Sequence, residues 1–225
     1  MERAFVWAGG GLFVSSLALA VWMYAVWFGD ARPSVGWAPL ALDAFLLSCF
    51  ALHHSVCARA PIKRRLASVI PERLLRSVYV WIASLLLVAL CLLWRPIGGE
   101  LYRASGWRAW PFGFVQLAGV WLIARAVGAI DALELAGIRK PKVTDEELQD
   151  GGVYGIVRHP IYFGWVLGTF GAAHMTGDRL AWAVLTTAYL IIAMPWEEQS
   201  LERAFGRRYV DYKRRVRWKI LPYVY

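Results

Sequence analysis

Six long blocks of apolar residues constrain the fold of this sequence more than any other feature. They lie at residues 8–28, 37–55, 77–94, 110–130, 160–176 and 180–196. A helix of about 20 residues rises about 30 Å, which matches the hydrocarbon core of a bilayer. Because 59% of all residues are hydrophobic and only 18% are charged, we predict an all-α, polytopic integral membrane helical bundle of about six transmembrane helices. The first block is longer than a signal-peptide core, so we expect it to remain as a helix.

Lysine and arginine are distributed unevenly between the two sets of loops. Nineteen of the 25 precede the first block, follow the last, or lie between the second and third and between the fourth and fifth. The opposite loops hold five, and Arg125 lies inside the fourth block. Since cytoplasmic loops carry such an excess, we expect both termini in the cytoplasm. The net charge of +9 then reflects contact with anionic membrane lipids, and we do not expect nucleic acid as a partner.

The segment GVYGIVRHPIYFG, residues 152–164, places polar and backbone-breaking residues at the start of the fifth block. Pro160 suits the first turn of a helix, which puts Arg158 and His159 in the headgroup layer. The glycines let a ligand approach the backbone closely, and the two tyrosines offer aromatic faces for stacking. Two interpretations stay open: a positively charged membrane anchor, or one wall of a binding site.

Glu197 and Glu198 form an adjacent acidic pair at the end of the sixth block. Carboxylates there are costly unless paired or solvated, so they mark either a solvated helix end or a site that faces a cationic ligand. The charge count puts them on the same face as Arg158, which favours one shared site. An apolar stripe at helical spacing follows, surrounded by basic residues: Leu201, Phe205, Tyr209, Tyr212 and Val216. It predicts a C-terminal amphipathic helix on the membrane surface that roofs this site.

A few polar residues fall within the apolar blocks. Asp43 and His54 are eleven residues apart and share a helix face, so they form either a functional pair or a buried polar pair that fixes helix packing. We interpret His174 as a hydrogen-bonded core histidine. The three cysteines lack paired spacing, and we expect neither a disulfide framework nor a metal site.

Together the two polar segments resemble the isoprenylcysteine carboxyl methyltransferase superfamily, which includes phospholipid N-methyltransferases and bacterial methanethiol S-methyltransferases. The residues that carry the resemblance are Gly152, Tyr154, Arg158, His159, Pro160, Tyr162 and Gly164, then Glu197, Glu198, Leu201, Phe205, Gly206, Tyr209 and Tyr212. The first half is more weakly similar to the methanethiol methyltransferases and to NnrU-type proteins, through His54-Ser55, Ala58-Arg59, Pro71, Glu72, Arg76, Tyr79 and Trp94-Arg95-Pro96.

This resemblance implies S-adenosyl-L-methionine as the cofactor. Carried over position by position, the expected cofactor-binding residues are Glu146, Glu147, Leu148, Gln149, Tyr154, His159, Pro160, Ile161, Tyr162 and Glu197. One position departs from the family pattern. The prenylcysteine enzymes have a substrate-contacting arginine one helical turn before the acidic pair, where this chain has Ala193, which speaks against a prenylcysteine carboxylate as the acceptor.

The resemblance therefore predicts a membrane methyltransferase that acts on a small or lipophilic thiol. A thiol must become a thiolate to react, and His54, Arg59 and Arg158 are the candidate catalytic residues. The alternatives are methylation of a lipid amine or carboxylate, and a haem-binding NnrU-like membrane protein with His54 and His174 as axial ligands. We expect one domain over residues 1–225, with a four-helix part at 1–130 and a cofactor-binding part at 131–225; the oligomeric state stays open.

Overall fold

The computed structural model describes residues 2–57, 59–128, 133, 136–138 and 148–225. Its chain forms two compact units. The first unit comprises Met1–Leu101, Asp131–Pro141 and Thr176–Ala181. The second unit comprises Tyr102–Ile130, Lys142–Met175 and Trp182–Tyr225.

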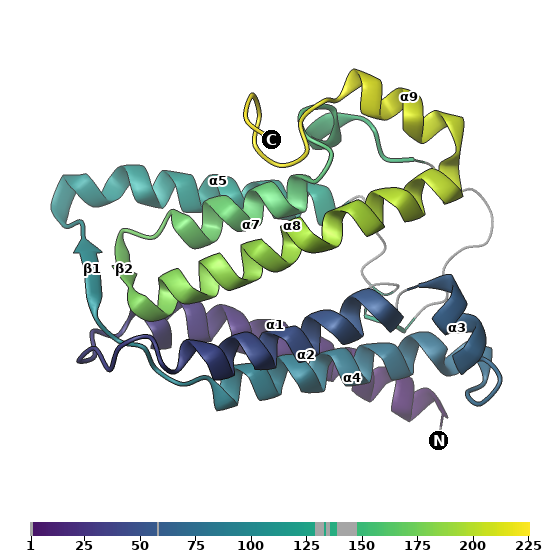
Figure 1. The fold of residues 1–225 in the computed structure, drawn as a ribbon, viewed down its shortest axis with the longest axis horizontal. Helices are drawn as coiled ribbons and strands as arrows, with labels where there is room; N and C mark the ends of the chain where they lie inside the picture. Colours follow the sequence, from purple (N-terminus) through teal and green to yellow (C-terminus); the bar gives the residue numbers. More distant parts are fainter. Residues whose placement is uncertain (1, 58, 129–132, 134–135, 139–147) are drawn as a thin grey trace. The chain divides into compact units, whose positions relative to one another are not determined.

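Long helices make up the first unit (Figure 1). Helices α1 and α2 both pack on α4. The elements are α1 (Glu2–Ala25), the 3-10 helix η1 (Trp27–Gly29), α2 (Leu40–Cys57), α3 (Ala60–Leu66) and α4 (Glu72–Leu93). Pro71 lies directly before α4, and its ring suits a helix start because it has no N–H to leave unsatisfied.

Two buried carboxylates fix the chain as it leaves α4. Asp178 accepts the Trp94 indole N–H at 2.9 Å, the Ile97 N–H at 3.0 Å and the Gly98 N–H at 3.0 Å. Asp43 accepts the backbone N–H of Arg95 at 2.9 Å. Buried carboxylates demand such donors, so Asp43 has a structural partner here. Of the two interpretations of Asp43, this contact favours the structural one.

The second unit contains most of the remaining elements. They are the 3-10 helices η2 (Gly106–Ala109) and η3 (Gly152–Gly155), with α5 (Trp110–Val127), α7 (Pro160–Phe170), most of α8 (Gly177–Phe205) and α9 (Arg207–Arg215). A short strand β1 (Glu100–Arg103) pairs with β2 (His174–Thr176).

Helices α5 and α7 are in close contact because glycines face each other. A Cβ built on Gly164 would lie 2.5 Å from the carbonyl oxygen of Gly119, and one on Gly119 would lie 2.5 Å from the carbonyl oxygen of Gly164. The Gln116 side chain also donates to the carbonyl of Gly168 at 3.0 Å. Small residues and interhelical hydrogen bonds are the usual basis of helix packing in membranes.

Five helices in the described part of the chain are long and apolar enough to cross a membrane. They correspond to the first four predicted spans and the sixth, and they confirm an all-α integral membrane bundle. Helix α7, in the predicted fifth span, has 11 residues and ends at Phe170. At 1.5 Å per residue it rises only about 16 Å, about half of a bilayer core.

The residues that follow α7 form hydrogen bonds with the segment before α5. The Ala104 N–H donates to the Ala173 carbonyl at 2.7 Å, and the Tyr102 hydroxyl donates to the Ala172 carbonyl at 3.0 Å. The chain after α7 thus lies beside residues that precede α5. Of the residues after α7, His174–Thr176 form the strand β2, whereas Gly171 has φ −80° and ψ 13° and is not extended.

Helix α8 continues beyond the predicted end of the sixth span at residue 196 and stops at Phe205. Gly206 then adopts φ +55°, a conformation that favours glycine, and α9 begins at Arg207. The predicted C-terminal amphipathic helix is therefore present as α9. The apolar stripe predicted on one helix is divided between the end of α8 and α9, and its members form one cluster: Tyr209, Tyr212 and Val216, packed by Leu148, Leu201 and Phe205.

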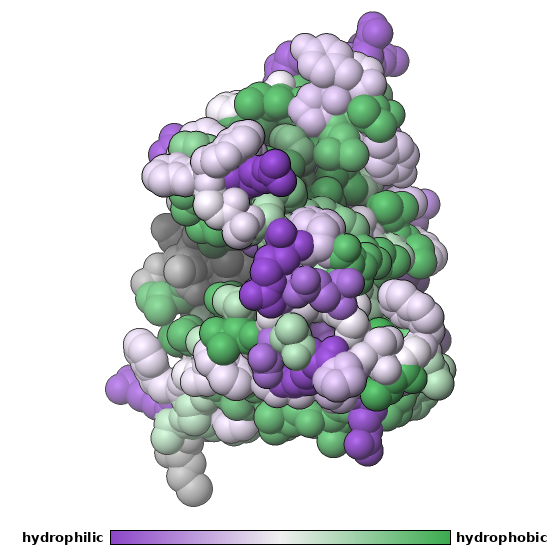
Figure 2. All heavy atoms as spheres, turned by 90° about the vertical axis from the view of Figure 1, so that its left-hand side faces the viewer, coloured by the Kyte–Doolittle hydropathy of each residue, from purple (hydrophilic) through white to green (hydrophobic). Residues whose placement is uncertain are grey.

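Apolar side chains also cover much of the surface. Figure 2 shows many hydrophobic residues on the face it presents. The outward residues of α1 and α5 include large aromatic and aliphatic side chains: Trp7, Val14, Val21, Trp22, Phe114, Leu117, Val120 and Trp121. Exposed apolar area of this extent on long helices is typical of contact with lipid.

Candidate functional site

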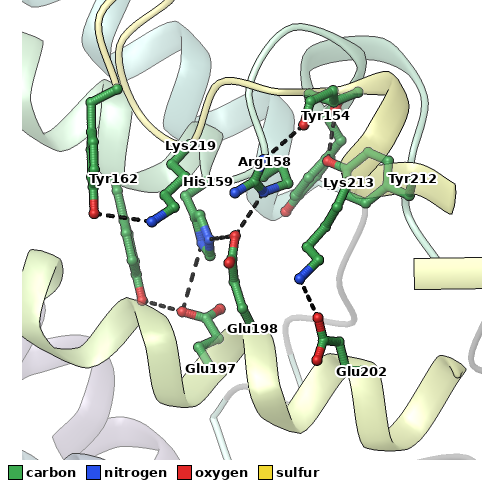
Figure 3. A network of polar contacts seen from close by, with 12 residues as sticks. Tyr154, Arg158, His159, Tyr162, Glu197, Glu198, Glu202, Tyr212, Lys213 and Lys219 are labelled. Carbon is green, nitrogen blue, oxygen red and sulfur yellow. Dashed lines mark hydrogen bonds and ion pairs between the residues drawn. The ribbon is translucent and has the colours of Figure 1, made fainter. Parts of the chain in front are cut away.

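An ion pair between Arg158 and Glu198 lies at the centre of the polar network in the second unit (Figure 3). The Arg158 Nε donates to Glu198 Oε1 at 2.7 Å. The two side chains are only 7% and 12% exposed. Arg158 precedes α7 and Glu198 is on α8, so the pair joins the two polar segments that the sequence placed in one site.

His159 and Tyr162 connect this pair to the second carboxylate. The His159 Nε2 lies 3.3 Å from Glu198 Oε1, and its Nδ1 lies 3.8 Å from Glu197 Oε2. The Tyr162 hydroxyl donates to Glu197 Oε2, and the Tyr162 ring stacks on the imidazole with centroids 5.1 Å apart. Pro160, which lies between His159 and Tyr162 in the sequence, begins α7. Both rings therefore lie at the first turn of that helix.

Glu197 and Glu198 have different surroundings although they are adjacent. Glu198 is half-buried and has both the Arg158 guanidinium and His159 within 3.3 Å. The Glu197 side chain is 45% exposed, and its hydrogen-bond donor in the described chain is the Tyr162 hydroxyl. Glu197 therefore keeps acceptor capacity and negative charge available to a ligand.

The C-terminal segment pairs directly with the start of α7. Arg158 N–H donates to the Trp218 carbonyl at 2.9 Å and His159 N–H to the Lys219 carbonyl at 2.8 Å. The Arg158 Nη1 also donates to the carbonyls of Val216 and Arg217, each at 2.8 Å. These four bonds hold residues 216–219 against the network.

Helix α9 covers the segment before α7. The Tyr212 hydroxyl donates to the Tyr154 carbonyl at 2.8 Å, and Arg215 forms an ion pair with Asp150. Burial raises the pKa of the Tyr212 hydroxyl above its usual range, and burial also raises the pKa of Tyr154. Both tyrosines are therefore neutral hydrogen-bonding groups at physiological pH.

One buried hydroxyl in this region has no partner among the described residues. Tyr209 is 1% exposed, and its OH group makes no hydrogen bond there. Burial, and then the charge of Glu198, raise the pKa of this hydroxyl. A buried donor without an acceptor costs about 1–3 kcal/mol, so the position is energetically expensive for the fold.

Two glycines at the start of the turn η3 have open space beside their backbone. A Cβ added to Gly151 or Gly152 would meet no atom of the described residues within 4 Å, and Gly152 has φ +56°. Tyr154, in the same turn, has a half-buried ring. Glycines with open space around them, next to a tyrosine in the same turn, let a flat ligand approach the backbone closely.

Several predicted site residues meet in this network: Arg158, His159, Tyr162 and Glu197. Pro160 is buried at the helix start, Ile161 is half-buried beside it, and Gln149 is exposed. Leu148 packs against the Tyr209 cluster. Glu146 and Glu147 lie outside the described residues. The cofactor role of each of these residues stays a prediction.

The candidate catalytic residues of the first half belong to the first unit. The His54 side chain is exposed, with its ring 5.6 Å from Phe50 and 5.9 Å from Tyr79. Arg59 directly precedes α3. In the second unit, the His174 imidazole lies 3.2 Å from Nη2 of Arg103. These contacts leave the catalytic and haem-ligand roles as predictions.

Sequence reasoning missed the contribution of the C-terminal segment. The carbonyls of Trp218 and Lys219 contact the start of α7, and no residue pattern signals a backbone contact of this kind. The Tyr212 hydroxyl was open to prediction, because a tyrosine on a buried apolar stripe needs a hydrogen-bond partner for its OH group.

Comparison with known proteins identifies the family to which this chain belongs. Residues 114–208 match the family model described as phospholipid methyltransferase. Methanethiol S-methyltransferase 2 of Bradyrhizobium diazoefficiens is 38% identical over 185 residues, which cover 79% of this chain and 71% of that protein. Methanethiol S-methyltransferase of Pseudomonas deceptionensis is 32% identical over 202 residues, covering 83% and 75% of the two chains.

A relative with a different name is also similar. Nurim of Danio rerio is 31% identical over 196 residues, covering 77% of this chain and 69% of that protein. No solved structure matches the chain. The matched residues include most of α5, all of α7 and α8, and the side chains of Arg158, His159, Tyr162, Glu197 and Glu198. The chain therefore belongs to the phospholipid methyltransferase superfamily of membrane methyltransferases, in the family of the methanethiol S-methyltransferases.

Proposed function

We propose that this membrane methyltransferase takes its methyl group from S-adenosyl-L-methionine and transfers it to a small or lipophilic thiol. The observation that carries the proposal is the difference between the two adjacent carboxylates. Glu198 is neutralised by Arg158, whereas Glu197 is exposed and oriented by Tyr162. An oriented, uncompensated carboxylate beside stacked rings suits a ligand that combines hydroxyl groups with positive charge.

The chemistry of the donor set fits this cofactor. Glu197 would accept hydroxyl groups of the ribose and favour the nearby sulfonium charge. The stacked rings of His159 and Tyr162, and the open turn at Gly151 and Gly152, would hold the adenosyl group. The Arg158–Glu198 pair would keep His159 in place, since it holds the imidazole through Glu198 Oε1.

When bound, the cofactor supplies a methyl group on a positively charged sulfur. The acceptor thiolate would form a bond to the methyl carbon as the sulfonium–methyl bond breaks, with the electron pair left on the donor sulfur and the thiol proton passed to a base. His54, Arg59 and Arg158 are the candidates for the base and for the cation that favours the thiolate. The protein would contribute mainly by positioning the reactants and by excluding water.

Similarity supports a thiol as the acceptor. The two bacterial relatives described above are both named methanethiol S-methyltransferase, and each aligns over about four-fifths of this chain. Ala193 stands where prenylcysteine enzymes have an arginine for the substrate carboxylate. A lipid amine or carboxylate is the alternative acceptor. The match of residues 114–208 to the phospholipid methyltransferase family supports this alternative.

A labelled-methyl transfer assay tests the proposal. Purified protein in liposomes is given methyl-labelled S-adenosyl-L-methionine with methanethiol, longer alkyl thiols, a prenylcysteine or a phospholipid amine. We expect label in the thioether product of the thiols and His54→Gln to lower that rate. Label only in the prenylcysteine ester or the lipid amine would contradict the thiol assignment.

We also propose that both termini lie in the cytoplasm of a bacterial inner membrane. The excess of Lys and Arg around the Arg158 segment and the tail supports this orientation. The contact of Arg158 with Glu198 places both polar segments at one end of the second unit, as this orientation requires. In a variant whose three native cysteines are replaced by serine, single cysteines introduced at Arg207 and at Gly106 should react with an impermeant maleimide from opposite sides of the membrane. Reaction of both from one side would contradict the orientation.

A further inference from the structure

Lys219 is a half-buried cation beside the network, and the described residues show no ion pair between its ammonium group and a carboxylate. We infer that its ammonium group binds the carboxylate of the methionine part of the cofactor. This inference rests on the proposed use of S-adenosyl-L-methionine, and it names a residue outside the two motifs that predicted the site.

The backbone fixes Lys219 beside the network. Its carbonyl accepts the His159 N–H at 2.8 Å, and the preceding Trp218 carbonyl accepts the Arg158 N–H at 2.9 Å. Lys219 is thus joined to the first turn of α7, where His159 and Tyr162 are stacked. Figure 3 shows the Lys219 side chain on the same side of the network as Tyr162 and His159.

Three other cations of the network region already have counterions. Arg158 is paired with Glu198, Lys213 with Glu202, and Arg215 with Asp150. The Lys219 Nζ contacts the hydroxyl of Tyr225 at 3.1 Å and lies 4.6 Å from the centre of that ring. Both contacts are to the uncharged side chain of Tyr225. A half-buried ammonium whose described side-chain contacts are neutral has a desolvation cost that a bound anion would offset.

Charge complementarity identifies the anion. S-adenosyl-L-methionine carries positive charge on its sulfonium and amino groups and negative charge on its carboxylate. Glu197 suits the hydroxyl-bearing and cationic parts, and it leaves the carboxylate without a partner. Arg158 is unsuited to that role, because its guanidinium already donates to Glu198 and to two backbone carbonyls. Lys219 supplies a positive charge beside His159.

Two ligands that differ in the amino-acid part separate this role from a general effect on the site. S-adenosylhomocysteine retains the carboxylate, whereas 5′-methylthioadenosine lacks the whole amino-acid part. Binding of each to the full-length protein in detergent is measured by calorimetry. The variants are Lys219→Met, which removes the charge, Lys219→Arg, which keeps it, and Arg208→Met as a control. Arg208 is an exposed residue on α9, so the control removes one positive charge from the same region.

We expect Lys219→Met to weaken S-adenosylhomocysteine binding about ten- to a hundredfold, the range of a lost charge-assisted hydrogen bond. Its affinity for 5′-methylthioadenosine should stay within about twofold of wild type. Lys219→Arg and Arg208→Met should bind both ligands nearly as well as wild type.

Three results would overturn the inference. Equal losses for the two ligands would give Lys219 only a structural role. Unchanged binding in Lys219→Met would show that its ammonium faces solvent or a lipid phosphate. Wild-type protein that binds neither ligand would overturn the proposed function as well, which distinguishes the two failures.

Discussion

Arg158 and Glu198, forty residues apart in the chain, form a largely buried ion pair of 2.7 Å that connects the start of α7 to α8. The same guanidinium holds the backbone of Val216 and Arg217. One side chain thus joins three segments that the sequence separates. The pair organises the site, and Glu197 beside it is left for a ligand.

Removing one partner of this pair should destabilise the protein strongly. Arg158→Met or Glu198→Gln leaves a buried group without its counterpart, at a cost of about 3–5 kcal/mol. The double variant Arg158→Met/Glu198→Gln should lose less than the two single losses added together, because the residues interact directly. Thermal unfolding of the purified variants in one detergent measures all three. Strictly additive losses would show that the pair does not couple the segments.

The glycine contact between α5 and α7 should be intolerant of a single methyl group. A Cβ at Gly164 lies 2.5 Å from the Gly119 carbonyl oxygen, so Gly164→Ala forces the helices apart and should cost about 1–3 kcal/mol. Gly168→Ala is the matched control on the same helix, since a Cβ there meets no atom within 4 Å. It should be neutral or slightly stabilising. Equal unfolding temperatures for the two variants would contradict the helix contact.

Tyr209→Phe should stabilise the protein slightly. The Tyr209 hydroxyl is buried without a partner among the described residues, and its removal avoids a desolvation cost of about 1 kcal/mol or more. The unfolding temperature should rise while cofactor binding stays unchanged. A fall in stability would reveal a partner such as a buried water, and a fall in binding alone would assign the hydroxyl to the ligand.

Stability should decline in alkaline solution as the buried tyrosines ionise. Burial raises the pKa of Tyr212 in the folded protein, whereas an unfolded tyrosine has a pKa of about 10. The corresponding stability is fully present below the unfolded value and is lost as pH rises through the folded value. Unfolding should therefore accompany tyrosinate absorbance above pH of about 10. The decline should be shallower in Tyr212→Phe, and an unaltered decline would contradict this role of Tyr212.

The sequence predicted most of the fold because long apolar blocks have few alternatives. Block lengths and the charged segments between them were sufficient to place α1, α2, α4, α5 and α8. The end of α7 at Phe170 could not be predicted, because residues 171–176 contain no proline and no Asp, Glu, Lys or Arg that would mark the end of an apolar block. What ends the helix there is the pairing of Ala173 and Ala172 with residues before α5, a contact distant in sequence.

The site was predicted to a similar extent. Arg158, His159, Tyr162 and Glu197 meet as the motifs indicated, since proline starts α7 and the acidic pair lies on α8. The contacts of Trp218 and Lys219 with the start of α7 were not predictable, because they are made by backbone carbonyls. Backbone contacts depend on the path of the chain and place no demand on residue type.

Binding of S-adenosyl-L-methionine to wild type, Glu197→Gln and Glu202→Gln is the most direct test of the central claim. Glu202 lies on the same helix and pairs with Lys213, so its variant controls for the loss of one negative charge. Calorimetry should show Glu197→Gln binding about tenfold or more weakly, as expected for a lost charge-assisted hydrogen bond, and Glu202→Gln binding as wild type does. His159→Ala is measured in the same way. Binding as strong as that of wild type in both Glu197→Gln and His159→Ala would contradict the account.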